Sequence, residues 1–318
     1  MNNIEIKDLG IKAGMTSNQI NKLKNKKRNN LLKKDIPKKD IPKVKTEKLP
    51  SARILNLKKD EYDERDFKLS SIAYGLPTKK DYTSQMSSVK DQKSLGSCVG
   101  FAVTAMKEWQ EQQEHLREVK KGKKYKREED HYDLSEAWVY WKCKEIDPWP
   151  NQEGTSIRCA MQVLNKIGIP CENAYSYSDK YKGEPKSWAK LIAKWGLIKS
   201  YYRCSDLNAL KTALANNGPV VIGIACFREI FYVGDNGNVP YPKNPNELLG
   251  GHAICAVGYD DNTQKIKFKN SWGTKWGQNG YGYISYSYIR DFMWDSWVAR
   301  DLRVDTKILR ERAKDELI

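Results

Sequence analysis

The sequence predicts an α+β protein in which an α-rich lobe packs beside a β-rich lobe. Helical patterns occupy the chain from about Leu76 to Gly218, and β-rich runs separated by Gly, Asn and Asp follow. With 318 residues, of which 39% are hydrophobic, the chain can bury a sizeable core. A cleft between two such lobes is a natural place for chemistry.

The N-terminal region is set apart by its charge. Residues 1–50 hold 14 Lys and Arg against 5 Asp and Glu, and the whole chain has a net charge of +16. The two Ile-Pro steps of KKDIPKKDIPK resist a helix, and apolar side chains are few. We therefore expect residues 1–52 to form a basic, disordered tail. Its charge can serve solubility, contact with nucleic acid or an anionic surface, or regulation as a pro-segment.

Residues 53–74, RILNLKKDEYDERDFKLSSIAY, carry large apolar side chains among charged ones. This composition makes them a candidate pro-segment or docking segment. If they lie near the cleft they would restrain activity, and if they cover a surface of the β-rich lobe they would only add stability. At the other end, residues 301–318 are expected to form a C-terminal helical tail.

Four segments between Leu76 and Gly218 place apolar residues at helical spacing. The clearest is FAVTAMKEWQEQQEHLREV, which a charged insertion, KKGKKYKREEDHYD, follows. The expected helices are residues 101–119, 134–146, 155–168 and 207–218, and Gly168 closes the third. The expected strands are residues 219–226, 252–260, 265–273 and 281–289.

Cys98 follows Leu-Gly-Ser at the start of an apolar, helix-prone run. Free N–H groups and the helix dipole at such a position lower the pKa of a thiol. Position alone leaves two interpretations open, a buried small residue and a nucleophile. There is no CxxC pair, so we expect no zinc site. Four of the other cysteines are expected to be buried and inert, namely Cys143, Cys159, Cys226 and Cys255.

A thiolate nucleophile needs a base, and His252 is the best candidate among three histidines. His115 and His131 lie in or beside the charged insertion, where a solvated role is expected. His252 follows two glycines and begins an apolar strand, although a core histidine remains an alternative. Eighteen residues later, the amide of Asn270 can accept the imidazole N–H. Gln92, six residues before Cys98, can supply a side-chain N–H to an oxyanion hole.

Three blocks together, DQKSLGSCVGFA, GGHAICAVGYD and NSWGTKWGQNGYGYI, are similar to the signature blocks of papain-like cysteine peptidases. The resemblance covers about residues 75–300 and implies a two-lobed fold. It has an α-helical left lobe (about 85–195), an antiparallel, β-barrel-like right lobe (about 196–300), and the active-site cleft between them. By resemblance, Cys98 is the nucleophile, His252 the general base and acid, Asn270 the orienting residue, and Gln92 the oxyanion donor.

The resemblance also implies a substrate cleft. Trp272 would shield the Asn–His hydrogen bond, Trp276 would wall the leaving-group side, and Gly154 would offer backbone hydrogen bonds to an extended substrate. The family's second glycine is replaced by Thr155. The pocket for the second residue before the scissile bond would be lined by Ile157, Gly223 and Ala253. We expect an apolar side chain there, whereas a preference for Arg would implicate Asp295, near the unassigned pocket floor.

Three departures from the family pattern bear on its branch and compartment. Val99 replaces the usual Trp, and Leu95 and Gln152 stand where the family commonly has a disulfide pair. The odd cysteine total and the lack of an apolar stretch in MNNIEIKDLG favour a prokaryotic-type, cytoplasmic protein. No run of residues is apolar enough to span a bilayer.

The predicted activity is that of a cysteine endopeptidase that acts on peptide or protein substrates without a metal or cofactor. Two alternatives remain. One is a catalytically silent binding protein recruited by its basic tail, and the other is a transpeptidase or ligase on the same scaffold.

Overall fold

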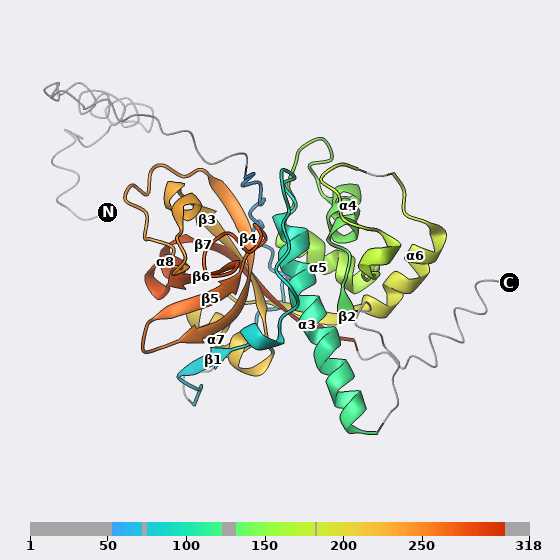
Figure 1. Ribbon diagram of the computed structural model, residues 1–318, viewed down its shortest axis with the longest axis horizontal. Coiled ribbons are helices and arrows are strands. Elements are labelled where there is room, and N and C mark those ends of the chain that lie inside the picture. The colour runs from blue at the N-terminus through green and yellow to red at the C-terminus, as the bar shows by residue number, and fades with distance from the viewer. Residues whose placement is uncertain (1–52, 72–74, 123–131, 182, 303–318) are drawn as a thin grey trace, which may run out of the picture. The chain divides into compact units, whose positions relative to one another are not determined.

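A computed structural model describes residues 53–71, 75–122, 132–181 and 183–302 of the chain. The expected tail of residues 1–52, most of the expected C-terminal tail and His131 lie outside these residues. Figure 1 shows a group of helices beside a twisted antiparallel sheet. The α+β prediction is confirmed.

The helical lobe is built on α3 (Cys98–Lys120), which is buried over its first half. It packs against α4 (Glu136–Ile146) and α5 (Ile157–Lys166), and α6 (Ser187–Ala193) follows. Serine caps fix two of these helices: the Oγ of Ser135 accepts the Trp138 N–H, and that of Ser156 accepts the Cys159 N–H. The three predicted helices of this lobe are therefore confirmed, and α3 begins at the cysteine itself.

The β-rich lobe contains an antiparallel sheet in the order β2-β7-β3-β4-β5-β6, and β1 pairs with β4. Its strands are β1 (Lys79–Asp81), β2 (Ile198–Arg203), β3 (Val220–Cys226), β4 (Gly250–Asp260), β5 (Lys265–Lys269), β6 (Tyr281–Ser285) and β7 (Met293–Asp301). It also holds α7 (Leu207–Asn216) and α8 (Tyr286–Phe292), and short 3₁₀ helices cover Thr83–Gln85, Glu172–Ala174, Lys194–Gly196 and Arg228–Tyr232.

The sheet bears on two sequence-based expectations and corrects one of them. Among the described strands no ladder joins β6 to β2, so the expected barrel-like sheet is an open one. The run YGYISYSYI is a strand only up to Ser285, whose Oγ accepts the Tyr288 N–H at 3.1 Å and caps α8. The aromatic residues of this run favour a strand locally, but the Ser285 cap and the packing of Tyr288 in the core stabilise a helix from Tyr286 onwards.

One apolar cluster packs the helical lobe against the face of the sheet that α3 covers at β4, and a second apolar cluster contains the alternate strand residues, on the opposite face. Strand β3 is buried along its whole length, between β4 and β7. This arrangement brings the start of α3 next to the start of β4, although more than 150 residues separate them in the sequence.

Residues 53–69, which we call the covering segment, pass along the boundary between the lobes (Figure 1). The Leu57 N–H donates to the Gly251 carbonyl of the sheet lobe, and the Lys58 N–H donates to the Thr155 carbonyl of the helical lobe, both at 3.0 Å. Further on, the Arg203 N–H donates to the Phe67 carbonyl at 2.8 Å. The covering segment therefore bonds to both lobes.

Buried acidic groups anchor the covering segment beyond the cleft. The carboxylate of Asp60 accepts hydrogen bonds from the Arg158 N–H and from the indole N–H of Trp297, at 3.1 and 2.9 Å. The Asp66 carboxylate pairs with Arg158 at 2.5 Å and with Arg203 at 3.2 Å. Burial raises the pKa of Asp60, because desolvation outweighs its hydrogen bonds.

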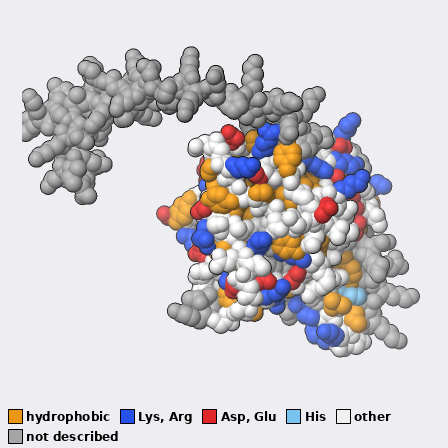
Figure 2. Space-filling model, turned by 60° about the vertical axis from the view of Figure 1, so that its left-hand side comes forward, with side chains coloured by type: hydrophobic (Ala, Val, Ile, Leu, Met, Phe, Trp, Pro, Cys, Tyr) orange, Lys and Arg blue, Asp and Glu red, His pale blue; other side chains and the backbone are white. Residues whose placement is uncertain are grey.

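The described surface mixes charges of both signs. On the face drawn in Figure 2, Lys and Arg side chains are interspersed with Asp and Glu. Among the residues that the structure describes, no helix has the length and apolar character needed to cross a membrane.

Candidate active site

The Cys98 thiol lies at the first residue of α3 and is fully buried. The backbone N–H groups of Ala253, Val99 and Cys98 itself are directed at its sulfur and favour the thiolate. Burial nevertheless raises the pKa of the thiol to about 11, because desolvation disfavours the thiolate more than these N–H groups stabilise it. The sulfur is thus directed at β4, next to the predicted base.

The His252 ring lies in β4 and is held by Asn270. Its Nε2 is 2.8 Å from the Asn270 Oδ1, and its Nδ1 has no hydrogen-bond partner among the described residues. Burial lowers the pKa of His252 to about 4, the bond to Asn270 opposes this shift, and the positive charge of Arg53 adds to it. The imidazole is therefore neutral in this state, with Nδ1 available to exchange a proton.

Asn270 and Ser271 connect the imidazole to the predicted oxyanion donor. The Ser271 N–H also donates to the Asn270 Oδ1, at 2.8 Å, and the Ser271 Oγ donates to the Gln92 Oε1 at 2.6 Å. The Gln92 Nε2 donates one N–H to the Leu95 carbonyl at 2.9 Å. The amide of Gln92 is thus fixed in orientation, and its second N–H remains for another acceptor. The sequence reasoning missed Ser271, which stands directly after Asn270.

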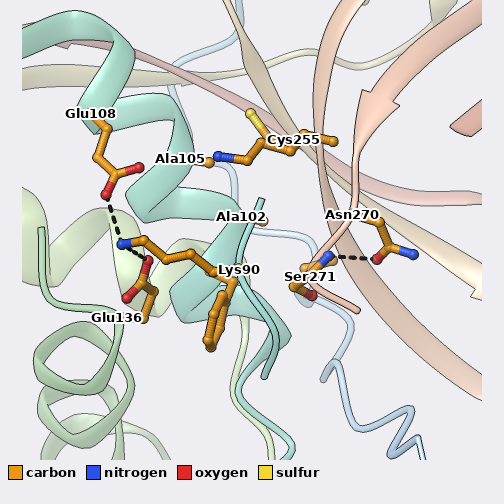
Figure 3. A pocket seen from close by; sticks show the side chains of 11 residues that line it. Lys90, Ala102, Ala105, Glu108, Glu136, Cys255, Asn270 and Ser271 are labelled. Carbon is orange, nitrogen blue, oxygen red and sulfur yellow. Dashed lines mark hydrogen bonds and ion pairs between the residues drawn. The ribbon is translucent and has the colours of Figure 1, made fainter. Parts of the chain in front are cut away.

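A buried ionic cluster lines a pocket beside these residues (Figure 3). The Lys90 Nζ lies 3.0 Å from a Glu108 oxygen and 2.6 Å from a Glu136 oxygen. Burial raises the pKa of Glu136 to about 8, and the charge of Lys90 opposes that shift. Figure 3 places Asn270 and Ser271 on the other side of the same pocket. The sequence reasoning missed this cluster, because its three members are single charges in three separate segments.

Aromatic rings cover the imidazole on one side. Trp272 lies over His252 with 4.6 Å between ring centroids, and Phe231 stacks on Trp272 at 5.5 Å and 4°. Trp276 packs edge-on against Trp272 and is 9% exposed, and its indole N–H donates to the Ile230 carbonyl. Trp272 thus covers the ring that Asn270 holds, and the nearly buried Trp276 packs against Trp272. Shielding by Trp272 and a leaving-group wall at Trp276 stay predictions. Phe231 was not foreseen.

The predicted substrate groove is filled by the covering segment. At Gly154, whose φ is +85°, an added Cβ would come within 1.8 Å of the Asn56 carbonyl oxygen, so only glycine fits. Thr155, the departure from the family pattern, keeps the backbone function, since its carbonyl accepts the Lys58 N–H.

The predicted specificity pocket holds Leu57, which is 4% exposed. A Cβ added at Gly223 would be 2.6 Å from a Leu57 methyl carbon and 3.2 Å from one of Ile157. Ala253 is opposite Gly223 in the β3–β4 register, but it is fully buried and its N–H is directed at Cys98. Asp295 is 2% exposed, and Arg203 pairs with its carboxylate at 2.7 Å.

Within the described residues, one group of side chains has the spacing of a metal site, namely Glu111, Glu114 and Asp301. It lies at the far part of α3, and Lys107 already forms ion pairs with two of its members. The half-buried His115 is near this end of α3, where its ring faces Tyr132. All seven cysteines are free thiols, and the four expected to be buried are buried.

Comparisons with known proteins agree with this geometry. The family model described as papain family cysteine protease matches residues 76–292. An uncharacterized peptidase C1-like protein of Acanthamoeba polyphaga mimivirus is 28% identical over 67% of this chain and 69% of its own length. The structure of xylellain, a cysteine protease from Xylella fastidiosa, aligns over 78% of this chain and 96% of that chain, with 27% identity and a TM-score of 0.66.

A proform also aligns with the chain. Digestive procathepsin L 3 of the Tenebrio molitor larval midgut is 25% identical over 74% of this chain and 73% of that chain, with a TM-score of 0.55.

Proposed function

The chain belongs to the papain family of cysteine proteases, and from this premise we propose that it is an endopeptidase restrained by its own covering segment. The observation that carries the proposal is that Cys98 stands at a helix start that packs on the strand of His252, whose Nε2 lies 2.8 Å from the Asn270 Oδ1. A binding protein would have no use for a cysteine at a helix start together with an oriented histidine. The fixed amide of Gln92 adds a donor for the oxyanion, the third group that acyl transfer needs.

The proposed reaction has two steps. In the first, the Cys98 proton passes to the Nδ1 of His252 while the sulfur bonds to the substrate carbonyl carbon. The Gln92 side chain and the Cys98 N–H hold the oxyanion. The C–N bond then breaks as His252 returns the proton to the leaving amine. In the second step His252 takes a proton from water, which attacks the thioester and releases the acid and the thiol.

The covered cleft is not in the reactive protonation state. Burial raises the pKa of Cys98 to about 11 and lowers that of His252 to about 4, so both groups are neutral near pH 7. Water that enters on opening would stabilise both charges, and the thiolate–imidazolium pair could then form. Undocking of the covering segment would thus supply both access and activation.

The direction of the covering segment protects it from hydrolysis. Arg53 lies over Trp272 on the leaving-group side, and Leu57 lies later in the chain, in the pocket for the second residue before the scissile bond. A substrate chain, followed from its N-terminus, passes first the pocket that Leu57 fills and then the leaving-group side at Trp272, which is the opposite order. The covering segment therefore occupies the cleft without offering a carbonyl in the productive orientation.

The pocket supports an apolar substrate side chain. Leu57 fills it against Ile157 and Gly223, so a Leu-sized group is the natural ligand. Because Arg203 already pairs with Asp295, this carboxylate is not free to select Arg at this position. The free thiols, together with Leu95 and Gln152 at the family's disulfide positions, favour action in a reducing compartment such as the cytoplasm.

The activity is tested by labelling and mutation. An epoxysuccinyl inhibitor should label Cys98, and Cys98→Ala should abolish peptide hydrolysis while the fold persists. Cys171→Ala, at a half-buried cysteine outside the cleft, is the matched control. Full hydrolysis by Cys98→Ala would rule out the mechanism, and absence of labelling in a chain that begins at Tyr74, which lacks the covering segment, would favour a silent binding protein. Product analysis with an added amine would reveal acyl transfer, the transpeptidase alternative.

A further inference from the structure

Arg53 makes the most specific contacts of the covering segment on the leaving-group side. Its guanidinium pairs with both carboxylate oxygens of Asp91, at 2.5 and 3.4 Å. It also donates to the Trp272 carbonyl at 3.1 Å and lies 5.9 Å from the centroid of the Trp272 ring. A forked pair, a carbonyl acceptor and an aromatic face together match the shape and charge of a guanidinium.

Asp91 is held in place by the domain and not by Arg53. Its Oδ1 accepts the Lys93 N–H at 2.8 Å, and its backbone forms a β-bridge with Trp272. A Cβ added at Gly273, where φ is +75°, would lie 3.3 Å from the Asp91 Oδ2. The site is thus formed by the backbone segments of Asp91 and Trp272, which a β-bridge joins, and it would persist when the covering segment leaves.

The carboxylate is charged and reachable. Side-chain exposure is 41% for Asp91 and 26% for Arg53, so solvent reaches both side chains of the pair. Although burial opposes it, the hydrogen bonds from Arg53 and the Lys93 N–H keep the pKa of Asp91 below its ordinary value. Without Arg53, this carboxylate would stand beside the exit path of the leaving peptide.

We propose that Asp91, together with the carbonyl and ring of Trp272, is a specificity-determining residue that binds an arginine side chain on the leaving-group side of the substrate. The inference rests on the proposed function and extends it to the other half of the cleft. Arginine is favoured over lysine, because only a planar guanidinium can bond both oxygens and stack on the indole. Arg53 of the covering segment imitates this substrate residue while the cleft is closed.

The competing interpretation is that Asp91 only anchors the covering segment. The test uses the full-length chain with Arg53→Ala and Leu57→Ala, which removes the segment's own two side chains from the cleft. Two sets of fluorogenic peptides carry arginine or its neutral isostere citrulline at the first or second position after the scissile bond. The ratio of kcat/KM between the two peptides of a pair is measured with and without Asp91→Asn. Asp235→Asn, at an exposed loop carboxylate, is the control for loss of one charge.

We expect arginine to be favoured about tenfold at one of the two positions, equal to about 1.4 kcal/mol. Asp91→Asn should bring this ratio close to one, and Asp235→Asn should leave it near tenfold. Equal rates for both peptides of each pair, or a preference that survives Asp91→Asn, would overturn the inference.

A binding experiment separates this inference from the proposed function. The same peptides are titrated by fluorescence anisotropy against the chain that also carries Cys98→Ala. If peptides bind with the arginine preference but none is hydrolysed by the Cys98 form, the peptidase proposal fails and the Asp91 site stands. If peptides are hydrolysed without any such preference, the peptidase proposal stands and the Asp91 site fails. If no peptide binds or is cleaved, both fail.

Discussion

Replacing Leu57 by alanine should open the cleft of the full-length chain. Leu57 is 4% exposed, and the change removes three buried carbon atoms. At about 0.8 kcal/mol for each carbon, docking of the covering segment would weaken by about 2.4 kcal/mol. Since 1.4 kcal/mol is a factor of ten, the undocked fraction should rise about 60-fold while it is small. The backbone bonds of Leu57 and Lys58 remain, so the segment is weakened and not deleted.

The assay compares hydrolysis of one peptide with an apolar residue two positions before the scissile bond, the rate of Cys98 labelling, and a thermal melt. Tyr62→Ala is the control, because this side chain belongs to the same segment but is 70% exposed. A chain that begins at Tyr74 should react at least as fast as Leu57→Ala. If both variants hydrolyse the peptide at the rate of the full-length chain and only melt at lower temperature, the covering segment is structural and inhibition is refuted.

The remaining predictions concern the catalytic set, its protonation and its support. Asn270→Ala should lower kcat less than His252→Ala, since it disturbs the orientation of the ring and not proton transfer; equal losses would contradict this assignment. In the full-length chain the pKa of the buried Cys98 thiol is raised to about 11, so the thiol stays protonated at neutral pH. Labelling by iodoacetamide, measured by mass spectrometry of the peptide that contains Cys98, should therefore rise with pH towards that value. A plateau near pH 8 would contradict the raised pKa. Lys90→Met should lower the free energy of unfolding by about 3–5 kcal/mol, because it removes the cation that pairs with the buried Glu108 and Glu136, whereas exposed Lys186→Met should leave the melting temperature unchanged.

Local patterns in the sequence determined the secondary structure that carries the candidate site. The helix that begins at Cys98 and the strand that carries His252 follow from apolar periodicity and from glycines at their ends, because such patterns act within a few residues. The pairing of His252 with Asn270 was foreseen through the order of the three motif blocks, and the structure has this pairing at 2.8 Å.

Local sequence patterns did not predict the features that depend on contacts between residues far apart in the chain. Strand β7 was not predicted, because an aspartate such as Asp295 is expected at the surface. In the structure it is buried, since Arg203, 92 positions earlier in the chain, pairs with its carboxylate. The same ion pair removes the acid from the expected pocket floor, which the sequence left open. Neither outcome could be read from a window of neighbouring residues, since each depends on which strands pair.

The course of the covering segment was decided by tertiary structure alone. Its composition indicated that it would dock, but not whether it would enter the cleft or in which direction. Leu57 finds its pocket between residues from both lobes, and Arg53 meets Trp272, which lies 219 positions later in the chain. Such contacts exist only once the lobes have assembled, because burial and charge pairing depend on distances in space and the sequence records only distances along the chain.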